Sequence, residues 1–107
     1  MNFFEDLKAS AYHKWLDYYR LNRDWLRRIA GWQVKTSDGV YRPNSFIILT
    51  AISALEPDLL QLLPSFGKLS NNPDTIVEVL GLNFNPETVL DQIQSQNAKL
   101  LEGQNDE

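Results

Sequence analysis

Ten consecutive residues in the middle of the chain, FIILTAISAL (46–55), carry no charge and are apolar except for one Thr and one Ser. Pro-Asn-Ser (43–45) opens a helix here, and Glu56-Pro57 ends it, because a residue before proline avoids helical backbone. The run is too short to cross a membrane, since a spanning helix needs about 20 apolar residues. A helix without a polar face must be covered by other segments. The sequence therefore predicts a buried central helix over residues 45–55.

A seam of mostly apolar and aromatic side chains runs through the first thirty residues. Its members recur every three or four positions, as one face of an α-helix requires, and they are Phe4, Leu7, Ala11, Trp15, Tyr18, Asn22, Trp25, Ile29 and Trp32. Tyr12, Tyr19 and Leu26 flank this seam and widen the apolar stripe. Asn2 can cap the start of this helix and Gly31 can stop it. We expect one helix over about 3–30, packed on the central helix through Trp15, Tyr18, Trp25 and Ile29. The polar member, Asn22, either fixes register against a partner helix or bonds a neighbouring loop.

A turn signal follows this helix. Asp38-Gly39 is typical of a tight type I′ turn, in which both central residues adopt positive φ. Val34 and Thr36 alternate with polar residues before the turn, and Val40 and Tyr41 follow it. The sequence predicts a small two-stranded hairpin over about 33–42, which must lean on the helices because an isolated hairpin is marginal in water.

Prolines divide the rest of the chain into short helices. One helix is expected over 57–69, interrupted or ended by Pro64, with four leucines facing inward: Leu59, Leu60, Leu62 and Leu63. Two further helices are expected from the similar strings NPDTIVEVL (72–80) and NPETVLDQI (85–93). In each, Asn can cap, Pro takes the first helical position and an acid meets the helix dipole.

These elements define one fold class. A chain of 107 residues fits a single domain, and the expected domain is mainly α: a compact bundle of about five helices with one small β-hairpin. The domain should occupy residues 1–101. Residues 102–107 should form a frayed acidic tail, since they have nothing to bury.

Charge is unevenly placed along the chain. Residues 1–42 carry a net charge of +3 and residues 43–107 a net −7. In one interpretation the arginines of the first helix lie on a solvated face, where Asp17 pairs with Arg20 and Asp24 pairs with Arg20, Arg27 and Arg28. In the alternative, a nucleic-acid-binding regulator uses Arg20, Arg23, Arg27 and Arg28. The sequence pI of about 4.9 favours the first interpretation, and peripheral contact with lipid headgroups is a third.

No known chemical motif is present. The chain has no cysteine and one histidine, His13, so no metal ligand set and no cofactor are expected. An enzyme would need acidic residues brought together by folding. The acidic start MNFFEDLK is not a secretory signal, and a cytoplasmic location is expected.

The surplus of aromatic residues instead favours a non-catalytic protein-interaction, assembly or adaptor module. Its partner would be another protein or a second copy of the chain. The candidate contact residues are Trp32, Tyr41 and Arg42, because Trp, Tyr and Arg dominate binding hot spots. Packing of Trp32 beneath the hairpin is an equal alternative.

Three strings together resemble a known family: KWLDYYRLNRDWL (14–26), FIILTAISALEPDLLQLLP (46–64) and NNPDTIVEVLGLNFNPE (71–87). They are similar to a cyanobacterial family of small proteins known only as domain of unknown function 5331. The resemblance spans about residues 3–90. It implies a cyanobacterial source and a soluble intracellular protein, and it supplies no active site to transfer.

Overall fold

The computed structural model describes residues 2–69 and 71–105, with the side chains of all of these except residues 60, 66, 67, 69 and 102–105. The chain is mainly α, as predicted, with one antiparallel hairpin. In chain order its elements are α1 (Phe3–Leu26), β1 (Gln33–Lys35), β2 (Tyr41–Pro43), α2 (Ser45–Leu55), α3 (Pro57–Leu60), α4 (Leu63–Leu69), α5 (Pro73–Val79) and α6 (Pro86–Asn105).

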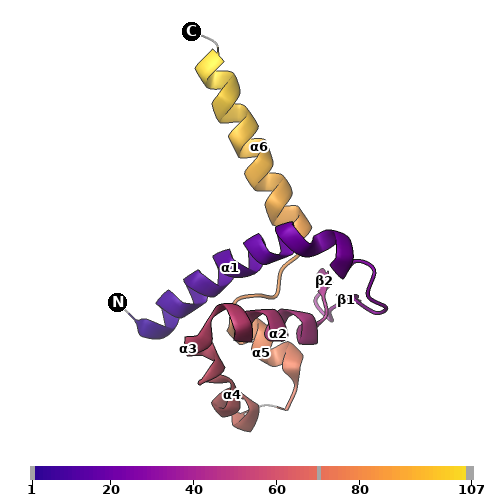
Figure 1. Cartoon of the computed structure of the whole chain (residues 1–107), viewed down its shortest axis with the longest axis vertical. Helices are drawn as coiled ribbons and strands as arrows, with labels where there is room; N and C mark the ends of the chain where they lie inside the picture. The colour runs from indigo at the N-terminus through magenta and orange to yellow at the C-terminus, as the bar shows by residue number, and fades with distance from the viewer. Residues whose placement is uncertain (1, 70, 106–107) are drawn as a thin grey trace.

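The uncharged helix α2 lies at the centre, and its predicted bounds are confirmed. The Asn44 side chain accepts a hydrogen bond of 3.0 Å from the backbone N–H of Ile47, which caps the first turn. Helix α1 packs along one side of α2, and α3 and α5 contact it as well (Figure 1). Ile48 and Ile52 are fully buried there. The core therefore forms around α2, because no part of this helix gains from facing water.

Helix α1 begins as expected but ends earlier. Asn2 accepts a hydrogen bond of 2.8 Å from the N–H of Phe4. The helix stops at Leu26, four residues before the predicted end, and the chain continues in single turns in which Ile29 N–H bonds the Leu26 carbonyl. Gly31, with φ of +72°, then reverses the chain into the hairpin.

The buried face of α1 is also rotated from the predicted seam. Leu7, Ala11 and Trp15 are buried as expected, but the buried line then passes through Tyr19 and Leu26, two of the residues predicted to flank the seam. Tyr18 is only partly buried, and Trp25 and Ile29 are 47 % and 39 % exposed. The expectation of a continuous Trp15–Tyr18–Trp25–Ile29 stripe under α2 is therefore wrong in its second half, because the last turn of α1 is covered on a different side.

The hairpin is present with a longer turn than predicted. Gln33, Val34 and Lys35 pair with Pro43, Arg42 and Tyr41, respectively. Thr36 N–H bonds the Val40 carbonyl at 2.8 Å, so three residues, 37–39, make the loop. Gly39 has φ of +87° and Asp38 does not have positive φ. The type I′ assignment was wrong, because a three-residue loop needs one left-handed residue and not two.

The segment 57–69 forms two helices where one was predicted. Leu59 is buried, Leu62 and Leu63 are partly buried against the core, and the side chain of Leu60 lies outside the described part. Pro64 does not end a helix. It is the second residue of α4, where the N–H that proline lacks would have had no helical partner.

The two Asn-Pro strings each begin a helix, as predicted. Asn72 accepts from Asp74 N–H and Asn85 from Glu87 N–H, both at 3.0 Å. Between α5 and α6, Leu82 is buried and the ring of Phe84 lies 4.9 Å from that of Tyr12. The connection is therefore part of the core.

Helix α6 leaves the body beside the second half of α1 and points away from it (Figure 1). The radius of gyration, 15.8 Å, exceeds the roughly 13 Å of a compact domain of about 100 residues because of this projection. Helical backbone continues past Leu101 to Asn105. Residues 106–107 lie outside the described part, and the frayed tail over 102–107 stays a prediction.

A charge placed inside α2 should unfold the domain. Ile48→Asp buries an unpaired carboxylate and is expected to cost more than about 4 kcal/mol, whereas Thr50→Asp on the exposed face of the same helix should cost less than about 1 kcal/mol. Thermal unfolding followed by circular dichroism would compare the two variants. Equal losses would show that the outer face of α2 is covered as well.

Candidate functional site

An apolar groove lies between the end of α1 and the outer face of α2. It has a volume of about 400 Å³. One wall comes from α1 and the turn after it, and the other from α2. We call this surface the α1–α2 groove, and it is lined by Tyr18, Trp25, Leu26, Ile29, Phe46, Ile47, Thr50, Ala51, Ala54 and Leu55.

The early end of α1 opens this groove. Trp25 and Ile29 stand at the rim instead of packing on α2, and Phe46 on the opposite rim is 73 % exposed. Phe46, Thr50 and Ala54 are spaced by four residues, so they form one exposed stripe along α2. Large apolar side chains clustered at a surface depression are typical of an interaction site.

Hydrogen bonds hold the indole of Trp25 in place. Its Nε1–H donates to Asn22 Oδ1 at 2.7 Å, and Asn22 Nδ2 donates to the carbonyl of Tyr18 at 2.9 Å. The printed hydrogen bonds of the Asn22 side chain lie within its own helix and not to a neighbouring loop, and its role in register against a partner helix stays a prediction. Asn22 thus orients Trp25 at the rim of the groove. The sequence did not predict this role.

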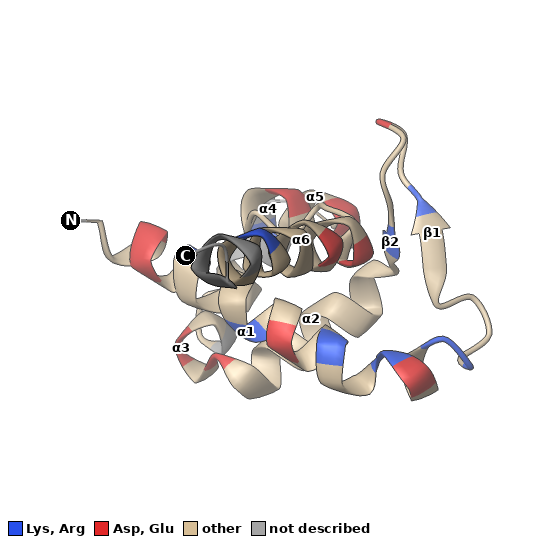
Figure 2. Cartoon of the chain, turned by 90° about the horizontal axis from the view of Figure 1, so that it is seen from above, with Lys and Arg blue, Asp and Glu red and all other residues tan. Residues whose placement is uncertain are grey.

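The groove carries no charged side chain. Figure 2 shows acidic and basic residues interleaved along α1, while α2 has neither. Lys14 closes the far end of α2, donating to the Leu55 carbonyl at 3.2 Å and to Glu56 at 3.0 Å. An occupant of the groove must therefore be held mainly through apolar surface.

The three predicted contact residues do not form one surface. Trp32 is partly buried and packs against the core, in line with the alternative that it lies beneath the hairpin. Tyr41 is 48 % exposed, with Lys35 Nζ 5.5 Å from the centre of its ring. Arg42 is only 1 % exposed, so its expected place on the surface was wrong.

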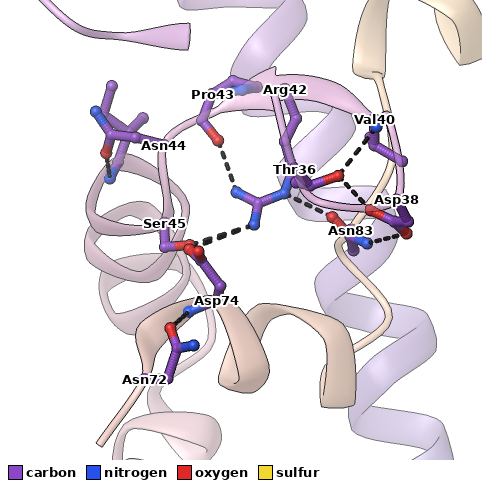
Figure 3. A network of polar contacts seen from close by, with 11 residues as sticks. Thr36, Asp38, Val40, Arg42, Pro43, Asn44, Ser45, Asn72, Asp74 and Asn83 are labelled. Atoms are coloured by element: carbon purple, nitrogen blue, oxygen red, sulfur yellow. Dashed lines mark hydrogen bonds and ion pairs between the residues drawn. The ribbon is translucent and has the colours of Figure 1, made fainter. Parts of the chain in front are cut away.

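Arg42 instead joins the hairpin to distant segments (Figure 3). Its Nε donates to Asn83 at 2.7 Å, Nη1 to the Pro43 carbonyl at 2.9 Å and Nη2 to Ser45 at 3.3 Å. Nη2 also lies 3.6 Å from an Asp74 carboxylate oxygen. Burying a guanidinium costs much free energy unless such partners compensate for the lost hydration. With these partners, Arg42 fixes the hairpin against α2 and α5.

Removing this buried cation should destabilise the fold. Arg42→Met leaves its acceptors unpaired and is expected to cost about 2–4 kcal/mol. Arg28→Met, at an exposed arginine, is a control expected to cost less than about 0.5 kcal/mol. Urea unfolding measures both values. A loss for Arg42→Met no greater than for Arg28→Met would contradict the structural role of Arg42.

The four arginines proposed for nucleic-acid binding are largely neutralised. Arg20 pairs with Asp17 at 2.6 Å, as predicted. Arg23 and Arg27 bind Glu87 of α6, and not Asp24 as expected for Arg27. Arg28 is exposed. Three of the four guanidinium groups thus face carboxylates, so the surface is not a continuous basic patch.

Glu87 is the anchor of α6 on α1. Its carboxylate accepts from Tyr19 Oη at 2.9 Å and from Arg23 at 3.2 Å, and it also pairs with Arg27. Burial alone would raise the pKa of Glu87, but the Tyr19 hydrogen bond and the Arg27 charge outweigh it, so this pKa lies below its usual value. Burial and the hydrogen bond to Glu87 raise the pKa of Tyr19. The α1–α6 contact therefore depends on an ionised Glu87.

This lowered pKa predicts acid sensitivity. The stabilisation by Glu87 is complete above the unfolded pKa of about 4.3 and is lost as pH falls through the lower folded pKa. Glu87→Gln should lower the free energy of unfolding by about 1 kcal/mol at pH 7 and by much less near pH 3. Asp24→Asn, at an exposed carboxylate, is the control. Urea unfolding at both pH values tests this, and an equal loss at pH 3 would contradict it.

Glu56 is a second carboxylate that joins segments distant in sequence. It is 6 % exposed, between α2 and α3, and accepts from Ser10 at 2.6 Å and from Lys14 at 3.0 Å. The Ser10 hydrogen bond, with help from Lys14, keeps the pKa of Glu56 below its usual value despite burial. These groups bind one another and join α1 to the α2–α3 junction.

The described residues, 2–69 and 71–105, contain no group of three or more His, Cys, Asp or Glu arranged to hold a metal ion. No single helix there is long and apolar enough to cross a bilayer, although Ser45–Leu55 and Pro57–Ser65, which meet at 111°, would suffice together by length and composition alone.

The fold and the groove thus define a small mainly α protein with an uncharged, apolar surface depression between α1 and α2. The chain belongs to the family of unknown function DUF5331, whose model matches residues 1–107. This confirms the family resemblance predicted from the sequence. Neither the curated proteins nor the solved structures give a match.

Proposed function

We propose that this protein is a non-catalytic interaction module whose α1–α2 groove binds an amphipathic helix of a partner protein. The observation that carries the proposal is the groove itself: α1, the turn after it and α2 expose Trp25, Ile29 and Phe46, respectively, around an uncharged depression. Covering these aromatic and aliphatic side chains with a partner would remove apolar surface from water, which favours binding.

A helix is the partner element that fits best. A groove between two helices accepts the apolar ridge of a third, with side chains at i, i+3, i+4 and i+7 as anchors. The orienting bond from Trp25 to Asn22 reduces the entropy lost when the indole is covered. The exposed Arg28 adjoins Ile29 at one end of the groove, so an acidic residue at that end of the partner helix is favoured.

Site-specific photocrosslinking in the source cells would find this partner. A photoreactive residue at Thr50, inside the groove, should give a discrete crosslink to one segment, and mass spectrometry should identify that segment as an amphipathic helix. The same residue at Ser95, on the polar face of α6, is the control. Equal crosslinking at both positions, or none at Thr50, would overturn the proposal.

The segment identified can then be synthesised and titrated. Phe46→Glu should weaken its binding at least tenfold, as expected for a hot-spot residue, without unfolding the protein, because Phe46 is 73 % exposed. Val79→Glu, at a residue 44 % exposed outside the groove, is the matched control and should leave binding unchanged. Equal effects of the two substitutions would show that the groove is not the binding site.

A further inference from the structure

The projecting part of α6 has an unpartnered apolar face. Residues 91–101 are all exposed. Among them Ile93, Leu100 and Leu101 are 43 %, 67 % and 60 % exposed. The first turns of the helix, around Glu87 and Leu90, contact the body.

The exposed apolar residues follow a coiled-coil spacing. Leu90, Ile93, Asn97 and Leu100 are separated by three, four and three residues, which gives positions a, d, a and d of two heptads. Polar residues occupy the other side of the helix, including Asp91, Ser95 and Lys99. This spacing is typical of a helix face that packs on another helix, and it continues outward from Leu90, which packs on the body.

A helix of this length gains from a partner. The last 15 residues of α6, 91–105, extend beyond Leu90, and an isolated helix of about this length is at the limit of stability in water. In most proteins, packing of an apolar face supplies the missing stability. The described part of the chain offers no such cover for Ile93, Leu100 and Leu101.

Charge and symmetry point to a second copy of the same helix. Between Val89 and Leu101 the charged residues, Asp91 and Lys99, occupy positions b and c, on the outside. The e and g positions beside the seam hold no charge, so identical helices meet without like-charge repulsion. Charged e and g positions, which usually select a different partner chain, are missing from this stretch of sequence.

Asn97 sets the direction of pairing. In a parallel pair in register, each Asn97 lies opposite its equivalent, and the two amides can hydrogen-bond one another. In an antiparallel pair, Asn97 would face Ile93 and its amide would be buried without a partner. We propose that α6 forms a short parallel coiled coil with α6 of a second copy, with Asn97 at its centre.

Concentration-dependent mass measurement tests this pairing. Sedimentation equilibrium of the full chain should show the 12.3 kDa monomer converting to a dimer as concentration rises. Leu100→Lys should shift the midpoint at least tenfold to higher concentration. Ser95→Lys adds the same charge at the outer position f and should leave the midpoint unchanged. Both residues are exposed in the monomer, so neither change disturbs the body.

Disulfide trapping tests register and direction. Because the chain has no cysteine, Asn97→Cys introduces one thiol per copy. In a glutathione redox buffer this variant should form a covalent dimer readily, and Ser95→Cys should do so at least tenfold less. A mass that stays at 12.3 kDa up to about 1 mM, or equal trapping at positions 95 and 97, would overturn the proposal.

A groove variant separates self-pairing through α6 from self-pairing through the groove. Phe46→Glu should leave the dimer midpoint unchanged. If Phe46→Glu abolished the dimer while Leu100→Lys did not, the second copy would occupy the α1–α2 groove, and the coiled-coil proposal would be wrong.

Discussion

The structure depends on covering α2. This helix has no charged residue, so every exposed turn of it costs free energy, and the rest of the chain is arranged to hide it. Helix α1 covers one side through its buried face, and α3 and α5 contact α2 as well. The cover is incomplete along Phe46, Thr50 and Ala54, because α1 ends at Leu26 and its last turn diverges. The same constraint that creates the core thus leaves an apolar groove at its edge.

Three buried or half-buried charges then fix the outer elements on this core. Arg42 holds the hairpin, Glu56 holds the α2–α3 junction and Glu87 holds the base of α6. Each bonds groups distant in sequence and each has several partners, which is the condition under which a charge can leave water. The interpretation of the charges as local pairs along α1 identified the Asp17–Arg20 ion pair but missed the long-range contacts of Arg42, Glu56 and Glu87.

The two proposals assign different faces to different partners. The α1–α2 groove would take a helix from another protein, and α6 would bring a second copy of the chain alongside. A dimer joined through α6 would present two grooves on one assembly, so a partner with two binding segments would bind more tightly than either segment alone. This arrangement suits an adaptor or assembly role.

Elements that depend on neighbouring residues could be predicted from the sequence alone. Local pattern predicted the Asn-Pro starts of α5 and α6, the start of α2 and a glycine-containing hairpin turn, because each depends on residues within a few positions. The apolar run at 46–55 also identified the central helix, because its composition leaves no other place for it.

The contacts between side chains from distant segments could not be predicted in this way. Trp25, expected in the core, lies at the rim of the groove, and Arg42, expected on the surface, lies inside the fold. The partner of Arg27 is Glu87 and not Asp24. The spacing of apolar residues along the sequence indicates which face of a helix they share. Where that helix ends, and which segment covers the face, depends on packing between parts of the chain far apart in sequence, and the groove exists because of that packing.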